Sequence, residues 1–135
     1  MRIILFGPPG VGKGSQAQFL SERENVTHIS TGILLRCAID SGTNLGRQVK
    51  GFVESGELVP GVLVRSLAEN AVSACNFERY VLDGYPRTIE QAEWIDAFLA
   101  ENQAPIDTVL SLTVPNSVIV NRLSKRRVHK ITGEN

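Results

Sequence analysis

The sequence predicts an α/β fold in which a parallel sheet lies between two layers of helices. Residues 3–6 form an apolar run without alternation, which suits a strand that is buried on both faces. Similar short runs then alternate along the chain with longer segments of helical pattern. The 135 residues suffice for one compact domain, and 42% hydrophobic with 21% charged residues is a globular balance.

The expected elements follow one another in a regular order. The predicted strands cover residues 3–6, 26–30, 80–83 and 108–114. The predicted helices cover residues 16–24, 33–39, 60–74, 88–100 and 115–126. Ser30 or Thr31 is expected to cap the second helix, and Pro60 to open the third. Glycines punctuate the polar stretch from 42 to 56, which is predicted to form a small helical subdomain carried on the core.

Charge and cysteine content exclude several classes of protein. Lys plus Arg and Asp plus Glu number 14 each, so a nucleic-acid binder with a bulk basic surface is not expected. Cys37 and Cys75 form no CxxC pair and are predicted to be reduced, largely buried thiols of a cytoplasmic protein. The first apolar run is too short for a signal peptide or a membrane span, so no membrane association is expected.

A glycine-rich loop follows the first strand, where residues 7–15 read GPPGVGKGS. This segment fits the phosphate-loop pattern G-x-x-x-x-G-K. Gly10, Gly12 and Gly14 are expected to adopt positive φ angles, which turns backbone N–H groups inward around an anion. The next helix adds its positive N-terminus, and Lys13 a mobile cation. Because the loop stands between a strand and a helix, the sequence predicts a P-loop NTPase fold rather than a chance glycine turn.

The order GxPGxGKG followed by Ser resembles the nucleoside monophosphate kinases, and adenylate kinases above all. The resemblance extends over about residues 1 to 133. It implies ATP as the phosphoryl donor and AMP as the acceptor. The ATP-binding residues of the loop would then be Gly10, Val11, Gly12, Lys13, Gly14 and Ser15.

Two segments resemble the acceptor site of this family. Residues 30–36 resemble its STGDxLR segment, in which the Thr touches the acceptor base and the Arg grips its phosphate. Thr31 and Arg36 match, whereas Ile33 replaces the Asp. A simple helix cap at Thr31 and a solvated arginine at Arg36 are the alternatives. Residues 58–60 resemble the segment whose backbone contacts the acceptor adenine, and the resemblance implies that Glu57, Leu58 and Val59 bind AMP.

Residues 83–88, DGYPRT, resemble the DGFPRT motif of the same family. Asp83 ends an apolar strand at the carboxyl edge of the sheet, where ligands bind in open α/β sheets. Its carboxylate could hold the water shell of Mg²⁺. The resemblance implies that Gly84 lines the AMP site and that Arg87 forks onto a phosphate. Without a phosphate loop nearby, Asp83 would be a turn former.

Gln91 has two readings. Residues 88–91 fit a capping box, in which Gln91 reaches back to the backbone N–H of Thr88. The resemblance instead implies that Gln91 recognises the acceptor adenine. Both readings stay open at this point.

The basic segment near the end of the sequence resembles the approach to the mobile lid of the family. The resemblance implies that Arg122 stacks on the donor adenine and that Arg126 contacts the transferring phosphate. A basic helix end that complements the helix dipole is the alternative for Lys125 and Arg127. Some lids of the family hold zinc through cysteines, but residues 128–133 offer His129 alone, so no zinc is expected.

The resemblance also divides the chain into four parts. These are a core with the phosphate loop at 1–29, an AMP-binding subdomain at 30–59, a continuation of the core at 60–126 and the start of a lid at 127–135. Family members continue with the rest of the lid, a fifth strand and a final helix. We therefore expect the 135 residues alone to bind nucleotides with little catalysis, and to aggregate or dimerise through an open edge at the fourth strand. A full-length chain is expected to be a monomer.

The implied reaction is MgATP plus AMP giving two ADP, with Lys13, Arg36, Arg87 and Arg126 as the catalytic residues. Two other functions remain open. One is a pyrimidine monophosphate kinase on the same fold, and the other is a nucleotide-binding module that does not catalyse.

Overall fold

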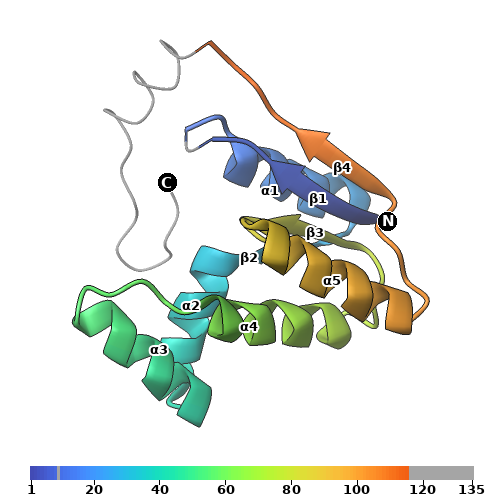
Figure 1. Ribbon diagram of the computed structural model, residues 1–135. Helices are drawn as coiled ribbons and strands as arrows, with labels where there is room; N and C mark the ends of the chain where they lie inside the picture. The colour runs from blue at the N-terminus through green and yellow to red at the C-terminus, as the bar shows by residue number, and fades with distance from the viewer. Residues whose placement is uncertain (9, 116–135) are drawn as a thin grey trace.

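A computed structural model describes residues 1–8 and 10–115. Strands and helices alternate along this part of the chain, except that three helices follow one another between β2 and β3 (Figure 1). The strands are β1 (Arg2–Phe6), β2 (Thr27–Ser30), β3 (Tyr80–Asp83) and β4 (Thr108–Ser111). The helices are α1 (Lys13–Glu24), α2 (Thr31–Ser41), α3 (Asn44–Glu54), α4 (Gly61–Ala74) and α5 (Ile89–Glu101).

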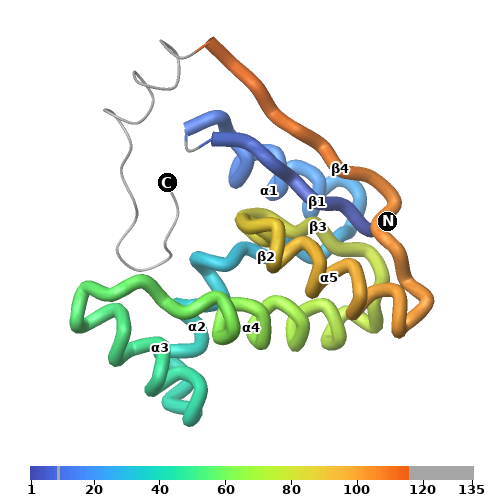
Figure 2. Tube along the Cα trace, viewed as in Figure 1, coloured from blue at the N-terminus to red at the C-terminus, as the bar shows by residue number. Residues whose placement is uncertain are grey.

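All four strands belong to one parallel sheet with the order β2-β3-β1-β4. The register pairs Asp83 with Leu5 on one side and with Ser30 on the other. The carboxyl ends of β1, β2 and β3 therefore meet at the same edge of the sheet, as the trace in Figure 2 shows. This edge is where ligands bind in open α/β folds.

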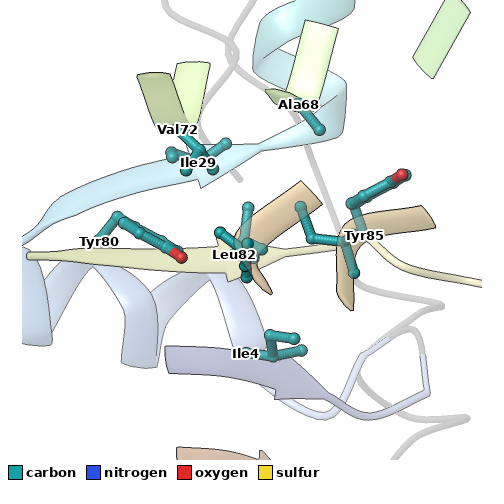
Figure 3. Packing of buried hydrophobic residues seen from close by; sticks show 9 residues of the cluster. Ile4, Ile29, Ala68, Val72, Tyr80, Leu82 and Tyr85 are labelled. Atoms are coloured by element: carbon teal, nitrogen blue, oxygen red, sulfur yellow. The ribbon is translucent and has the colours of Figure 1, made fainter. Parts of the chain in front are cut away.

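Helices cover both faces of the sheet, because neighbouring residues of a strand point to opposite faces. On one face, Ile29 and Leu82 pack with Val72 and Ala68 of α4, as Figure 3 shows, and with Ile95 of α5. On the other face, Ala17 of α1 packs in a cluster with strand residues Ile3, Leu5 and Val81 and with Val26. The predicted three-layer α/β fold is thus confirmed.

Helices α2 and α3 lie beyond the β2 edge of the sheet (Figure 1), and α3 is the helix within the stretch predicted for residues 42–56. Gly42 ends α2 with a φ angle of 67°, and the Thr43 side chain caps α3 by accepting a hydrogen bond from the Gly46 N–H at 3.1 Å. A Cβ atom at Gly46 would overlap the carbonyl oxygen of Ala38. Close packing of the two helices therefore requires glycine at this position.

Two expected boundaries need correction. Helix α1 begins at Lys13, three residues earlier than predicted. Strand β4 ends at Ser111 and not at Val114, although the N–H of Leu112 still donates to the Phe6 carbonyl at 2.8 Å. Its four residues are all exposed, and among the described strands β4 pairs with β1 alone.

The two cysteines are more exposed than the sequence predicted. Cys37 is exposed on α2 and Cys75 is half-buried at the end of α4, and neither forms a disulfide. Alanine at position 38, not Cys37, faces the packed side of α2. The helix predicted for 115–126 lies almost wholly outside the described residues.

Candidate functional site: the carboxyl edge of the sheet

The glycine loop lies between β1 and α1, as predicted. Gly10 and Gly12 adopt φ angles of 84° and 102°, in the left-handed region that favours glycine. Gly14 does not, so the expectation of a positive φ there was wrong. The reason is that α1 already begins at Lys13, which places Gly14 in its first turn, with open space where a Cβ atom would lie.

The loop directs the start of α1 toward the carboxyl edge of the sheet. The Gln16 N–H donates to the Gly12 carbonyl at 3.0 Å, the first hydrogen bond of the helix. The N–H groups of Lys13, Gly14 and Ser15 precede it, at the positive end of the helix dipole. Val11 is buried and its N–H donates to the Pro8 carbonyl at 3.2 Å. This arrangement can bind an anion such as a phosphate.

Thr31, Gly84 and Arg87 come together where β2 and β3 end. Thr31 is buried at the start of α2, and its Oγ1 donates to the Gly84 carbonyl at 3.4 Å. Gly84 has a φ angle of 91°. A Cβ atom there would lie 2.7 Å from Thr31 Oγ1 and 3.0 Å from Arg87 Nη2. The absence of a side chain at Gly84 thus lets the arginine and the threonine approach each other.

Gln91 is buried in the first turn of α5. Its N–H donates to Thr88 Oγ1 at 3.1 Å, as in the predicted capping box. Its side-chain Oε1, however, accepts from the N–H of Arg87 at 2.8 Å, and not from that of Thr88. The return bond is thus shifted by one residue, into a loop with a cis peptide bond between Tyr85 and Pro86. The amide Nε2 lies toward α4, 3.4 Å from where a Cβ atom of Gly61 would be.

Arg36 lies one turn into α2 and is exposed. Its Nη1 atom lies 3.9 Å from where a Cβ atom of Gly32 would be, so the guanidinium reaches back toward the start of the helix. Ser30 occupies the N-cap position without a side-chain cap, and Thr31 is the first helical residue. The expectation that one of these hydroxyls caps α2 was therefore wrong, since Thr31 donates to Gly84 instead. Ile33 is 42% exposed and packs little.

The segment before α4 is less closely joined to this cluster. Leu58 is 94% exposed and Val59 is half-buried. Glu57 lines a shallow hollow over α3 with Arg47 and Phe52. Among the described residues, no side-chain hydrogen bond links Glu57, Leu58 or Val59 to Thr31, Gly84, Arg87 or Gln91.

The structure also places His28 at the site, a residue that the sequence did not single out. Asp83 ends β3 with its side chain 12% exposed, and its Oδ2 lies 3.0 Å from Nε2 of His28 on β2. Because an ionised carboxylate has no proton to give, the imidazole is the donor. A lone histidine in a short strand carries no sequence pattern, and its partner is far along the chain. No motif could therefore have identified it.

Two tyrosines are fully buried, Tyr80 at the start of β3 and Tyr85 in the loop that follows the strand. Burial raises the pKa of Tyr85 to about 12, with the nearby Glu69 adding to the effect, and burial likewise raises the pKa of Tyr80 to about 12. Both phenols therefore stay neutral at ordinary pH. The Arg65 guanidinium of α4 lies 4.8 Å from the centre of the Trp94 ring of α5, a contact that joins the two helices. Arg65 also pairs with Glu69 of its own helix at 2.9 Å.

Other expectations lie outside the described residues. These are the roles of Arg122 and Arg126 and the absence of zinc at His129. Within residues 1–8 and 10–115, no three His, Cys, Asp or Glu side chains gather as a metal site would require. None of the helices in that part of the chain has the length and apolar character of a membrane span.

Comparison with known proteins adds independent information. The family model described as "Adenylate kinase" matches residues 5–133. The chain is 55% identical over 134 residues to an adenylate kinase of Salinibacter ruber and 52% identical over 136 residues to one of Chloroherpeton thalassium. Each alignment covers 99% of this chain but only 63% and 62% of the relative. An adenylate kinase of Methanothrix thermoacetophila is 46% identical over 96% of this chain and 61% of its own length. The chain thus spans less than two thirds of these relatives.

Proposed function

Because the chain belongs to the adenylate kinase family, we propose that it supplies the donor and acceptor sites of an enzyme that converts MgATP and AMP reversibly into two ADP. One observation carries the proposal. The glycine loop after β1 opens at the same edge of the sheet as the network of Thr31, Gly84, Arg87 and Gln91 after β2 and β3. A phosphate site and a second polar site therefore adjoin, as a transfer between two nucleotides requires.

The donor side is the glycine loop. Its N–H groups at the start of α1 would hold the ATP phosphates, and Lys13 would add a cation beside them. Asp83 fits an ion held through water, because it presents a carboxylate at the sheet edge next to the loop. Mg²⁺ would there neutralise charge on the donor phosphates. Arg122 would stack on the donor adenine and Arg126 would contact the transferring phosphate, and these two roles are supported by the resemblance to the family alone.

The acceptor side is the network at the ends of β2 and β3. Arg36 and Arg87 are exposed guanidiniums that would grip the AMP phosphate. Thr31 and the Gln91 amide would contact the base, with Leu58 and Val59 of the loop before α4. In this proposal residues 30–59 form the AMP-binding part, and residues 1–29 and 60–126 form the core.

The chemistry needs alignment and charge neutralisation more than covalent help. An oxygen of the AMP phosphate would attack the γ-phosphorus of ATP in line, while Lys13, Arg36 and Arg87 surround the developing charge. No general base is required, because the attacking phosphate is already anionic at neutral pH. Closure of the lid and of residues 30–59 over the core would exclude water.

A coupled ADP-formation assay on the full-length protein tests the proposal. AMP should be phosphorylated in preference to UMP and CMP, and Lys13→Ala should abolish detectable transfer. Lys50→Ala is the matched control, because Lys50 is an exposed lysine of α3 whose ion-pair partner, within the described part of the chain, is Glu54. A Lys13→Ala rate within about tenfold of the parent, or about 1.4 kcal/mol, contradicts the assigned role. Preference for UMP or CMP favours a pyrimidine kinase, and nucleotide binding without turnover favours a binding module.

A further inference from the structure

The bond between His28 and Asp83 crosses two neighbouring strands beside the phosphate loop. Ser30 is the residue of β2 that pairs with Asp83, so His28 lies two positions before it on the same face. That face also carries Val81 and is covered by α1, the helix that follows the loop. The contact therefore stands directly behind the proposed Mg²⁺ and phosphate site.

The geometry gives the two oxygens of Asp83 different surroundings. Oδ2 is occupied by the His28 Nε2–H at 3.0 Å, from a residue farther back along the sheet. Among the described residues, this is the only side-chain hydrogen bond that Asp83 makes. Rotation of a carboxylate about its χ2 angle is broad and roughly two-fold, so one firm contact to Oδ2 also orients Oδ1.

The partners of this bond are largely shielded from water. The side chains of His28 and Asp83 are 19% and 12% exposed. A hydrogen bond to a charged group is strengthened by such shielding. Removal of the imidazole would leave a mostly buried carboxylate free to rotate.

We propose that His28 is a positioning residue, which holds Asp83 so that Oδ1 faces the water shell of the Mg²⁺ that enters with ATP. This inference rests on the proposed function, since it requires MgATP at the glycine loop. His28 touches neither nucleotide nor metal in this arrangement, and it acts only through Asp83. Residues that orient a metal-binding group in this way commonly change metal affinity by about 10–100-fold when they are replaced.

Equilibrium titration calorimetry on the full-length protein separates this role from a purely structural one. ATP affinity is measured with Mg²⁺ and again with EDTA, and the ratio of the two dissociation constants is the readout. His28→Leu should weaken MgATP binding about tenfold, the lower end of that range because Asp83 acts through water, while ATP binding in EDTA stays unchanged. His28→Gln should keep the parent ratio, because its amide nitrogen lies where the imidazole Nε2 was.

Two further variants keep the test decisive. His28→Asn has an amide too short to reach Asp83, so it should behave as His28→Leu does and replaces it if the leucine variant does not fold. In an Asp83→Ala background, His28→Leu should have no additional effect on the ratio.

The outcomes distinguish this proposal from the proposed function. An unchanged ratio in His28→Leu and His28→Asn overturns the role of His28, whether ATP binding is unaffected or is weakened equally with and without Mg²⁺. Failure of His28→Gln to keep the ratio also overturns it. A parent protein that binds no ATP under either condition overturns the proposed function itself.

Discussion

The side-chain oxygen of Gln91 accepts a hydrogen bond from the backbone N–H of Arg87 at 2.8 Å. Together with the bond from the Gln91 N–H to Thr88 Oγ1, this contact closes the first turn of α5. The cap uses the oxygen of the amide, so the NH₂ group remains as the donor for a base. Helix capping and the proposed adenine recognition would therefore employ different atoms of one side chain, and they do not exclude each other.

Replacement of Gln91 by Glu should separate these two roles. A carboxylate keeps an acceptor for the Arg87 N–H and is favoured in the first turn of a helix, so the melting temperature should fall little. It lacks the NH₂ donor, so the preference for AMP over UMP should be lost. Gln91→Ala should lose both the helix cap and the preference for AMP over UMP, and the loss of the cap should lower the free energy of unfolding by about 0.5–2 kcal/mol. Thermal melts and parallel assays with AMP and UMP measure the two effects. Full AMP preference in Gln91→Glu contradicts base recognition by the NH₂ group.

Gly84→Ala should weaken AMP binding more than ATP binding. The added methyl group would meet both Thr31 Oγ1 and Arg87 Nη2, on a backbone with a φ angle of 91°. Gly56→Ala is the matched control, because Gly56 has a φ angle of 77° with open space around it. The control therefore measures the backbone strain alone, about 1–3 kcal/mol. Kinetics with varied AMP check the prediction, and an AMP KM for Gly84→Ala equal to that for Gly56→Ala would falsify it.

Arg36→Ala and Arg87→Ala should each raise the apparent KM for AMP more than that for ATP. Loss of a hydrogen bond to a charged group costs about 1.5–3 kcal/mol, which is about 10–150-fold in affinity. Both variants should also lower kcat if the contacts strengthen in the transition state. Arg23→Ala, at the far end of α1, is the control. Steady-state kinetics with each nucleotide varied in turn measure the KM values for AMP and ATP. Unchanged AMP kinetics in both variants exclude this acceptor site.

Two glycines of α3 should respond oppositely to alanine. Gly46→Ala drives a methyl group into the Ala38 carbonyl, so stability should fall by about 1–3 kcal/mol or more. Gly51 has open space around it in the same helix, so Gly51→Ala should raise stability by about 0.5–1 kcal/mol. Urea denaturation measures both. Equal effects of the two substitutions contradict the close packing of α2 on α3.

Sequence reasoning predicted the features that local pattern controls. The apolar runs at Ile3 and Tyr80 identified buried strands, and the glycine motif identified a loop between strand and helix. It did not predict features that depend on contacts across the fold. The bond from His28 to Asp83 forms because the register of the sheet brings two strands together. Gly46 was predicted only as one of several glycines in a polar stretch, since the contact that requires glycine there is made with α2. The burial of Cys37 was misjudged since residue type does not reveal which side of a helix faces the core.

The place of β1 in the sheet has a consequence for biosynthesis. Of the described strands, β1 is the first to leave the ribosome, yet its two neighbours are β3 and β4, the last of them to be made. At typical elongation rates of about 5–20 residues per second, Ile3 and Leu5 wait on the order of 4–15 s before Tyr80 and its neighbours exist to pair with them. Among the described strands, the apolar strand that leads into the glycine loop therefore stays unpaired on the nascent chain for the longest time. A chaperone that binds exposed apolar segments of nascent chains should crosslink to this strand first.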